Sequence, residues 1–506
     1  MDEFSRGVQF PRAMNNPSQP ELRDMCLQQD HQETIYGSIN FISEVRSRSA
    51  EDTYIVDDGV SLGQRQQAIS LDEAARLAAE VRDYLANKKL IQVDRLVGYD
   101  SCVQSHCRLF VSADYPRLAY MWTKALFEPK NPDRTPDFLS IYVPEWPERK
   151  IFAHPEAGVT YILGTDYFGE AKKSFLRMLM YRQKKVGHLG FHAGSKVLRV
   201  CPQNHDDTTD EGFLLFGLSG TGKTTLTTHD HFLNGKERVV IRQDDVVVMN
   251  DQGECYGSEA GFFIKTRGLS EEQTLIYEAA KSPEALFENV TVDSEGVPHF
   301  EDSTLTGNGR AIVPRRKFRF TDDDINLPQV SNLIFITRRR DVLPPVARMT
   351  AEQSAAFFML GESEETSAGD PEKAGQARRE VGTNPFIIGP EAEEGTRLLE
   401  FLKKNPDIDC YLLNTGKVGF EKDITVEDSA TIIKELARDS IRWENDPDWN
   451  YEIPSSIPGL DVERYLPQSY MSGDEYKSRI ENLRRERIDW LQQFPDLDQH
   501  IIDCVK

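Results

Sequence analysis

Residues 211–226 read Glu-Gly-Phe-Leu-Leu-Phe-Gly-Leu-Ser-Gly-Thr-Gly-Lys-Thr-Thr-Leu. Apolar residues 213–218, which predict a β-strand, lead directly into the pattern G-x-x-x-x-G-K-T, which begins at Gly217 and ends at Thr224. Glycines at this spacing let backbone N–H groups turn inward around a phosphate, and the start of the following helix favours negative charge. We expect Lys223 to reach the β- and γ-phosphates and the Thr224 hydroxyl to bind magnesium. The stretch therefore predicts binding of a nucleoside triphosphate rather than a glycine-rich turn without a ligand.

The loop and an acidic pair beyond it supply candidate ligands for a nucleotide and its metal. The candidate nucleotide contacts in the loop are Gly217, Leu218, Ser219, Gly220, Thr221, Gly222, Lys223, Thr224 and Thr225. Loops of this kind are usually accompanied by a metal-binding acid at the end of a nearby strand. Asp244 and Asp245 fit, the second lying 22 residues beyond Lys223 (245 − 223 = 22). The alternative for this pair is an exposed acidic turn.

The composition limits the possible partners. The chain has 506 residues, with 60 Lys and Arg against 83 Asp and Glu, which gives a net charge of −23. Such acidity argues against nucleic acid or an anionic membrane as a main partner. Seven cysteines without a C-x-x-C spacing indicate no zinc ribbon and no disulfide framework. A polar N-terminus and short apolar runs predict neither a secretory signal nor a membrane span, so we expect a cytoplasmic protein.

The order of the predicted elements indicates an α/β fold with two domains. Ser70-Leu71-Asp72-Glu73 is a capping box at the start of a helix. Other helices are expected over 113–126, from about 167, and from Ser472 to about 494. Strands are expected over 91–93, 107–111, 138–143, 159–163, 239–241, 246–249 and 333–337. We expect an N-terminal mixed α/β domain over 1–187, with 1–35 as a poorly ordered lead-in, and a C-terminal phosphate-loop domain over 188–506.

Two further features indicate chemistry only in combination with the loop. The adjacent Lys172 and Lys173 are typical of a solvated helix face. His192 is a single histidine, and single histidines are usually structural. Neither feature decides a function by itself.

Taken together, these residues resemble the ATP-dependent phosphoenolpyruvate carboxykinases. The resemblance covers roughly residues 40–430 and is carried by motifs in the family's order. They are Arg48-Ser49, Tyr167-Phe168-Gly169-Glu170-Ala171-Lys172-Lys173, His192, the loop from Gly217 to Leu226, Asp244-Asp245, Lys265, Glu288-Asn289-Val290-Thr291-Val292, Arg310, Leu343-Pro344-Pro345-Val346-Ala347-Arg348-Met349-Thr350 and Asn414-Thr415-Gly416. The resemblance implies a two-domain fold with a P-loop nucleotide-binding domain and an active site in the cleft between the domains.

The resemblance also implies a reaction, in which oxaloacetate and ATP become phosphoenolpyruvate, CO2 and ADP. The catalytic residues that it implies are Arg48, Tyr167, Lys172, Lys173, Ser219, Lys265 and Arg310. Arg48 would bind a substrate carboxylate, and Tyr167 with Ser219 would lie where CO2 leaves. The nucleotide would also contact Lys265, Arg310, Ile424 and Ser429. Together with Lys223, Lys265 and Arg310 would spread the charge on the transferred phosphoryl group.

Two metal sites follow from the same resemblance. Lys173, His192 and Asp245 would bind a divalent ion, and Mn2+ suits their nitrogen and oxygen donors. This ion would polarise the oxaloacetate carbonyl. Mg2+ would bind Thr224, with Asp244 or Asp245 in its outer sphere, and would bridge the β- and γ-phosphates.

The chain departs from the family pattern in three places. Ser47, Ala50 and Glu51 stand where the arginine-serine motif has glycine, proline and lysine. In the adenine segment, Asp423 occupies the position of the family's stacking arginine, or Lys422 does if the motif is aligned one residue earlier. The lid is also altered, because Thr383-Asn384-Pro385-Phe386-Ile387-Ile388-Gly389 replaces a longer stretch that contains serine and cysteine.

These departures leave two alternatives to the carboxykinase. One is a small-molecule kinase of the same fold with a different anionic acceptor. The other is a non-catalytic nucleotide-binding homologue, in which the metal ligands should have drifted. The base preference, the oligomeric state and the physiological direction stay open, although the family usually works toward phosphoenolpyruvate in gluconeogenesis.

Overall fold

The fold consists of two units, each of which is built from three separate segments of the chain. A computed structural model describes residues 3–46, 49–132, 134–203, 207–364 and 376–505. Unit 1 contains Met1–Val186, Ser258–Arg319 and Phe386–Pro390, and unit 2 contains Gly187–Gly257, Phe320–Pro385 and Glu391–Lys506. The first boundary lies next to the expected division at 187. The units are not continuous, however, because Ser258–Arg319 packs with the N-terminal part of the chain.

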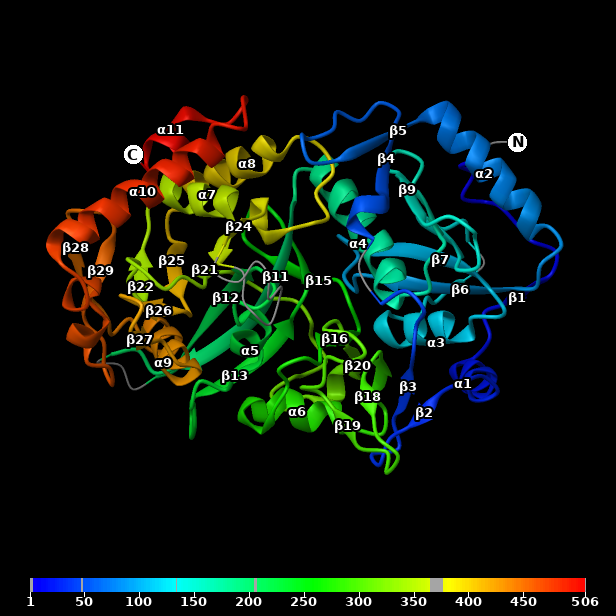
Figure 1. The fold of residues 1–506 in the computed structure, drawn as a ribbon, viewed down its shortest axis with the longest axis horizontal. Helices are drawn as coiled ribbons and strands as arrows, with labels where there is room; N and C mark the ends of the chain where they lie inside the picture. Colours follow the sequence, from blue (N-terminus) through cyan, green and yellow to red (C-terminus); the bar gives the residue numbers. More distant parts are fainter. Residues whose placement is uncertain (1–2, 47–48, 133, 204–206, 365–375, 506) are drawn as a thin grey trace. The chain divides into compact units, whose positions relative to one another are not determined.

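Unit 1 is built on a mixed sheet that, within the described residues, has eight strands (Figure 1). In spatial order these are β1 (Ala13–Asn15), β6 (Leu90–Val97), β7 (Ser105–Ser112), β8 (Phe138–Val143), β10 (Val159–Leu163), β9 (Lys150–His154), β4 (Thr53–Asp57) and β5 (Gln67–Ser70). Every residue of β7, β8 and β10 is buried. Strands covered on both faces read as continuous apolar runs, and this explains why these strands were predictable from the sequence.

Unit 1 also contains a second sheet and a set of helices. The second sheet runs β16 (Gly261–Lys265), β20 (Arg310–Pro314), β17 (Leu286–Glu288), β3 (Ile39–Phe41) and β2 (Gln32–Glu33). The helices of unit 1 are α1 (Gln19–Leu27), α2 (Leu71–Leu85), α3 (Pro116–Ala125), α4 (Phe168–Lys185) and α6 (Thr274–Ala280). Strand β17 pairs in parallel with β3, which lies about 250 residues earlier in the chain, and this long-range pairing places Ser258–Arg319 in unit 1.

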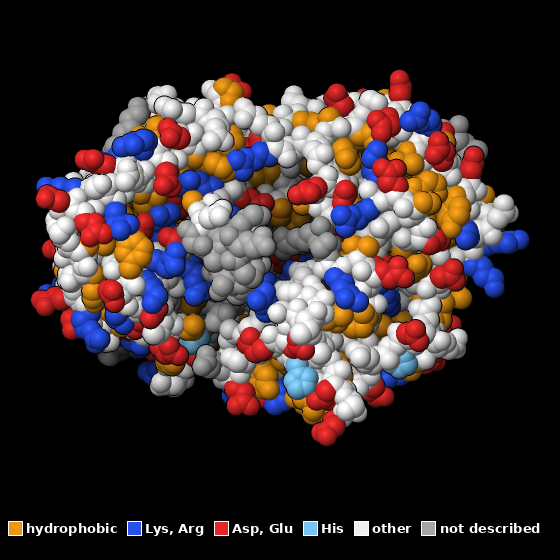
Figure 2. Space-filling model, viewed as in Figure 1, with side chains coloured by type: hydrophobic (Ala, Val, Ile, Leu, Met, Phe, Trp, Pro, Cys, Tyr) orange, Lys and Arg blue, Asp and Glu red, His pale blue; other side chains and the backbone are white. Residues whose placement is uncertain are grey.

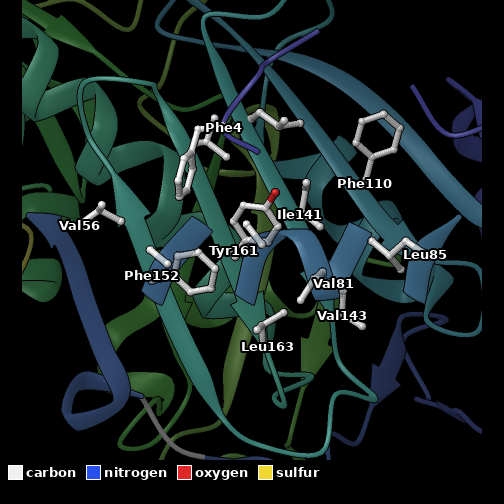
Figure 3. Close-up of a cluster of buried hydrophobic side chains, with 14 of the residues drawn as sticks. Phe4, Val56, Val81, Leu85, Phe110, Ile141, Val143, Phe152, Tyr161 and Leu163 are labelled. Atoms are coloured by element: carbon white, nitrogen blue, oxygen red, sulfur yellow. The ribbon is translucent and has the colours of Figure 1, made fainter. Parts of the chain in front are cut away.

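Helix α2 packs against one face of the eight-stranded sheet. Ser70 is its N-cap, and the hydroxyl of Ser70 accepts a hydrogen bond from the Glu73 N–H at 3.2 Å, which confirms the predicted start. The helix directs Val81 and Leu85 into an apolar cluster with side chains of the strands, including Phe152 and Tyr161 (Figure 3). The Phe152 and Tyr161 rings stack with their centroids 4.8 Å apart.

The N-terminal segment is part of this core, which corrects the expectation of a poorly ordered lead-in for the described residues 3–35. Phe4 and Phe10 are buried in the apolar cluster, and Phe10 meets Phe110 edge to face. Ser18 forms a capping box at the start of α1, and β1 pairs in parallel with β6. The segment is ordered by contacts with distant residues, and its polar composition gave no local sign of them.

Unit 2 is built on a sheet whose centre is parallel. Within the part of the chain that the structure describes, its path is β15 (Cys255–Gly257), β14 (Val246–Met249), β11 (Leu189–Val200), β12 (Thr209–Gly217), β21 (Asn332–Thr337), β25 (Asp409–Asn414), β22 (Val346–Arg348), β29 (Glu452–Ser456) and β28 (Arg442–Asn445), and β13 (Arg238–Gln243) pairs with β11. Strands β12, β21 and β25 are mutually parallel. Their carboxyl ends therefore meet at one edge, which is where open α/β sheets bind ligands.

Helices cover both faces of this sheet (Figure 1). They are α5 (Lys223–Thr228), α7 (Ala351–Leu360), α8 (Glu391–Lys404), α9 (Val426–Ala437), α10 (Gly473–Leu491) and α11 (Gln499–Asp503). Helix α7 packs on β21 and β25 and is covered by α8, α10 and α11, whereas α5 and α9 pack on β11. Helix α10 begins after Ser472, as predicted, and ends three residues before the expected end.

Three short strand pairs complete the fold. They are β18 (Thr291–Val292) with β19 (Pro298–His299), β23 (Glu362–Glu364) with β24 (Ala377–Arg379), and β26 (Lys417–Val418) with β27 (Lys422–Asp423). On the face shown in Figure 2, acidic and basic side chains are interspersed. Among the described residues, every helix is too short or too polar to cross a bilayer.

Candidate active site

The phosphate loop lies at the carboxyl edge of the parallel strands of unit 2. Strand β12 ends at Gly217 and α5 begins at Lys223, so the loop joins a buried strand to a helix as predicted. Glycine is required at three of its positions. Gly220 and Gly222 have φ of 91° and 94°, in the left-handed region, and a Cβ on Gly217 would lie 2.5 Å from the Thr221 hydroxyl. The loop therefore has the backbone that its sequence pattern predicts.

The lysine and threonine that end the loop pattern both contact Asp244. The buried Lys223 donates from Nζ to the Asp244 carbonyl at 2.6 Å, and the Thr224 hydroxyl donates to Asp244 Oδ2 at 3.1 Å. Asp244 is therefore the member of the acidic pair that faces the phosphate loop. A hydroxyl and a carboxylate in contact are oxygen donors of the kind that Mg2+ prefers.

The other acid, Asp245, faces His192. The Asp245 Oδ1 lies 2.9 Å from His192 Nε2, and both side chains are about one-fifth exposed. The sheet register explains the contact: His192 of β11 is opposite Val246 of β14, which is the residue after Asp245. Ala193 is opposite Phe216 of β12, so His192 lies at the same end of the sheet as Gly217. The structure therefore brings the His192–Asp245 pair to the edge that carries the phosphate loop.

A backbone carbonyl selects the neutral tautomer of the His192 ring. Nδ1 lies 2.6 Å from the carbonyl oxygen of Thr383, which can only accept, so Nδ1 must carry a proton. In the neutral tautomer the lone pair is then on Nε2, the atom that faces Asp245. Metal-binding histidines commonly have their second nitrogen fixed in this way. Thr383 belongs to the altered lid segment and has a positive φ of 50°.

In unit 1, three of the predicted catalytic residues lie on three elements, α4, β20 and β16. Tyr167 is the N-cap of α4 and is fully buried, and its hydroxyl accepts a hydrogen bond from Arg310 Nε at 3.1 Å. Arg310 is also held by the side-chain oxygen of Asn308 at 2.8 Å. Lys265 on β16 is directly opposite Arg310 on β20, so the two side chains share one face of the sheet.

Lys173 belongs to unit 1, whereas His192 and Asp245 belong to unit 2. Its Nζ lies 2.9 Å from Glu170 Oε1, one helical turn earlier in α4. Burial alone would raise the pKa of Glu170, but the charge and hydrogen bond of Lys173, with a hydrogen bond from the Ser49 N–H, outweigh it and lower the pKa. Glu170 is thus an ionised, buried carboxylate that fixes the Lys173 amine.

Lys172 has a different environment from its neighbour. Its side chain is almost fully buried, and its Nζ lies 3.2 Å from Glu259 Oε1 and 5.0 Å from the centroid of the Phe263 ring. The guanidinium of Arg310 lies 5.5 Å from the same ring. The solvated helix face that was the alternative for the two lysines is therefore wrong for Lys172.

The adenine segment forms the β26–β27 hairpin. Lys417 pairs with Asp423 at 3.1 Å, and Lys422 lies 4.6 Å from the centroid of the Tyr465 ring. Ile424 is buried in a small cluster with Tyr465. The Ser429 hydroxyl, within α9, donates to a backbone carbonyl one turn earlier. These contacts of Ile424 and Ser429, the two predicted nucleotide ligands of this segment, are thus with other residues of unit 2.

The remaining predicted residues have simpler placements. In the phosphate loop Ser219 is exposed and Thr225 is half-buried, whereas Leu218 and Thr221 are buried. Arg48 lies outside the described residues. Among the described residues, no three or more His, Cys, Asp or Glu side chains are grouped so as to hold a metal ion.

Sequence reasoning assigned no role to two residues that shape the site. Glu288 of β17 is fully buried, and its Oε1 accepts the Phe168 N–H at 2.8 Å, so it caps the start of α4 from outside the helix. Arg338, the first residue after β21, donates from Nη1 to the Gly220 carbonyl at 3.2 Å. The signal for Arg338 was available, since three arginines follow a predicted strand.

The fold and the phosphate-loop edge define an α/β nucleotide-binding protein. A family model described as phosphoenolpyruvate carboxykinase matches residues 11–463. A protein of Aeropyrum pernix named phosphoenolpyruvate carboxykinase (ATP) is 34% identical over 427 residues, which is 83% of this chain and 84% of that protein. The chain belongs to the ATP-dependent phosphoenolpyruvate carboxykinase family, a family of carboxy-lyases that use ATP and a divalent metal.

Proposed function

We propose that the chain catalyses the conversion of oxaloacetate and ATP to phosphoenolpyruvate, CO2 and ADP, in the direction of gluconeogenesis. The observation that carries the proposal is the His192–Asp245 pair at 2.9 Å, at the same sheet edge as the phosphate loop. A phosphate loop alone is compatible with many reactions. A histidine and a carboxylate next to it add the donors that a carbonyl-activating metal needs.

The chemistry requires charge to be stabilised at two successive stages. Loss of CO2 breaks a carbon–carbon bond and leaves its electron pair as the enolate of pyruvate. The enolate oxygen then attacks the γ-phosphorus, and the bond from that phosphorus to ADP breaks. The enolate must be phosphorylated before water can protonate it, so the residues around it must bind both reactants and exclude water.

The residues present fit a divalent metal. The Thr383 carbonyl fixes His192 in the tautomer that directs a lone pair toward Asp245, and the carboxylate supplies an oxygen donor. We propose that Lys173 completes this set after losing its proton, and that Mn2+ is the preferred ion. When bound, the metal polarises the carbonyl of oxaloacetate. Thr224 and Asp244 would hold a second ion, Mg2+, with the triphosphate.

The remaining roles divide between the nucleotide and the acid substrate. Lys223, Lys265 and Arg310 would neutralise the phosphoryl group during transfer, in addition to the N–H groups of the loop. Arg48 would bind a carboxylate of oxaloacetate. Tyr167, whose hydroxyl is oriented by Arg310, would lie with Ser219 where CO2 departs.

A direct assay tests the proposal. Purified protein with ATP, oxaloacetate and Mn2+ should form phosphoenolpyruvate and ADP in equal amounts, followed by 31P NMR. His192→Ala should abolish product formation and weaken Mn2+ binding. His299→Ala is the matched control, because His299 forms a similar contact with Asp293 at 2.8 Å on an exposed turn, and this variant should be as active as the wild type.

The alternatives give different results in the same assay. A kinase of another acceptor would release ADP only when that acceptor replaces oxaloacetate. A non-catalytic homologue would bind ATP without product, and its Mn2+ affinity would not change in His192→Ala. The absence of phosphoenolpyruvate with ATP, GTP and pyrophosphate as donors would refute the proposed reaction.

A further inference from the structure

Three consecutive arginines, Arg338, Arg339 and Arg340, begin immediately after β21. Strand β21 is parallel to β12, with Ile336 opposite Gly217, so the arginines follow the strand end that lies beside the start of the phosphate loop. They therefore bring three positive charges to this edge of unit 2.

The three arginines have different partners. Arg339 is buried and binds Asp341 through Nε at 3.2 Å and Nη2 at 2.7 Å. Arg340 is exposed and binds Glu364 at 2.7 Å. Two of the charges are thus neutralised locally by carboxylates. The charge of Arg338 is directed instead at the phosphate loop, where its Nη1 donates to the carbonyl of Gly220.

The guanidinium of Arg338 retains the capacity to bind an anion. A guanidinium has five N–H donors in a planar fork. Among the described residues, the Gly220 carbonyl accepts one of them, and Nε and Nη2 have no hydrogen-bond partner. The side chain is exposed, so these donors reach solvent next to the loop. A phosphate group would satisfy them in the bidentate geometry that arginine prefers.

A purely structural role is the competing explanation. Another loop carbonyl, that of Thr221, accepts a hydrogen bond from the Thr415 hydroxyl at 2.7 Å. Arg338 could hold Gly220 in the same way. A hydroxyl would suffice for that purpose, however, and a fully charged side chain in this chain of net charge −23 is better explained by an anionic ligand.

We propose that Arg338 is a phosphate-binding residue of the nucleotide site, and that its guanidinium contacts the polyphosphate of ATP from the Gly220 side of the loop. The proposal rests on the proposed function for the identity of the nucleotide. It adds a cation that the loop motif does not contain, in a protein whose other basic loop residue, Lys223, contacts the Asp244 carbonyl. The contact is with phosphate, so it should not depend on the base.

The test compares Arg338→Met with two matched controls. Arg340→Met removes a neighbouring exposed arginine that is already paired, and Thr415→Val removes a neutral hydrogen bond to the loop. Calorimetry would give the dissociation constants of ATP and of inorganic tripolyphosphate, both with Mg2+, at low and high salt. Thermal unfolding would establish that each variant is folded, as expected for an exposed side chain.

We expect Arg338→Met to raise both dissociation constants about tenfold, the loss of one charge-assisted hydrogen bond. Salt should weaken ATP binding less in this variant than in the wild type, because a screened charge pair is missing. Arg338→Lys should recover part of the affinity. Arg340→Met should bind like the wild type, and Thr415→Val should weaken binding without altering its salt dependence.

Three results would overturn the proposal. They are an unchanged affinity in Arg338→Met, an effect on ATP without an effect on tripolyphosphate, and an unchanged salt dependence. These results are independent of the proposed reaction. If only the proposed reaction were wrong, the wild type would still bind ATP through Arg338 but would form no phosphoenolpyruvate.

Discussion

Replacing Glu362 by glutamine should destabilise unit 2, because Glu362 is the acid of a buried ion cluster. Its Oε1 accepts hydrogen bonds from Nε, at 3.0 Å, and from Nη2 of Arg487, and its Oε2 lies 3.4 Å from Arg379 Nη2. The side chains of Glu362 and Arg487 are 1% and 0% exposed. Burial alone would raise the pKa of Glu362, but the arginines outweigh it and lower the pKa to about 2.

The pKa gives the size of the effect. A fall from 4.5 to about 2, at 1.36 kcal/mol per pKa unit, corresponds to about 3 kcal/mol of stability at neutral pH. Breaking a buried ion pair by removing one partner costs about 3–5 kcal/mol, since the other charge stays buried. We therefore expect Glu362→Gln to lower the free energy of unfolding by about 3 kcal/mol. This contribution is complete above pH 4.5 and is lost as the pH falls through about 2.

The neighbouring Glu364 provides a control on the same strand. It pairs with the exposed Arg340 at 2.7 Å, and its other oxygen lies 3.9 Å from Arg339, so Glu364→Gln should cost less than Glu362→Gln. Urea unfolding can be followed by tryptophan fluorescence, because the Trp449 ring centroid lies 5.1 Å from the Arg487 guanidinium. A chain of this size unfolds in more than one step, so the variants are compared in the transition that this signal reports.

Two results would refute the reasoning. One is a Glu362→Gln variant as stable as Glu364→Gln at pH 7. The other is a difference between wild type and Glu362→Gln that does not shrink as the pH is lowered from 4.5. Either result would mean that the ionised form of Glu362 is not favoured by its arginine neighbours.

Three other predictions concern the site and its support. Thr224→Ala should weaken MgATP binding about tenfold in calorimetry and leave metal-free ATP unaffected, because it removes only the metal-binding hydroxyl. Tyr167→Phe should lower kcat about tenfold with little change in the KM for ATP, because Arg310 loses the hydroxyl that orients it; an equal change in both constants would contradict this. Burial raises the pKa of Glu288 to about 7. The folded protein therefore keeps a proton that the unfolded chain loses between pH 4.5 and 7. The stability of the wild type should fall as the pH rises over this range. In urea unfolding, Glu288→Gln should therefore become more stable relative to wild type by about 3 kcal/mol from pH 4.5 to 7, and parallel pH profiles would exclude this role.

The features that local sequence determines were predictable. The phosphate loop follows from glycines whose positive φ is required at Gly220 and Gly222, and the start of α2 follows from the Ser70 cap. Buried parallel strands were visible as apolar runs. In each case the physical cause lies within a few residues, so one sequence is sufficient to find it.

The features that depend on pairing between distant segments were not predictable. Phe4 and Phe10 lie in a polar segment, and their burial follows from a core whose strands come later in the chain. The contact of His192 with Asp245 depends on the register of β11 and β14, and only the family resemblance suggested it. Arg338 reaches Gly220 because β12 and β21 are neighbours, and the sequence alone does not specify that order.

The parallel centre of unit 2 has a consequence for synthesis of the protein. Strand β12 ends at Gly217, but its neighbour β21 begins at Asn332 and the third parallel strand ends at Asn414, 197 residues beyond Gly217 (414 − 217 = 197). A ribosome adding about 5–20 residues per second needs about 10–40 s for that interval. During this time the growing sheet has an unpaired apolar edge, first that of β12 and then that of β21, which favours aggregation. Recovery of folded protein should therefore depend on chaperones that shield this edge until translation has passed the third strand.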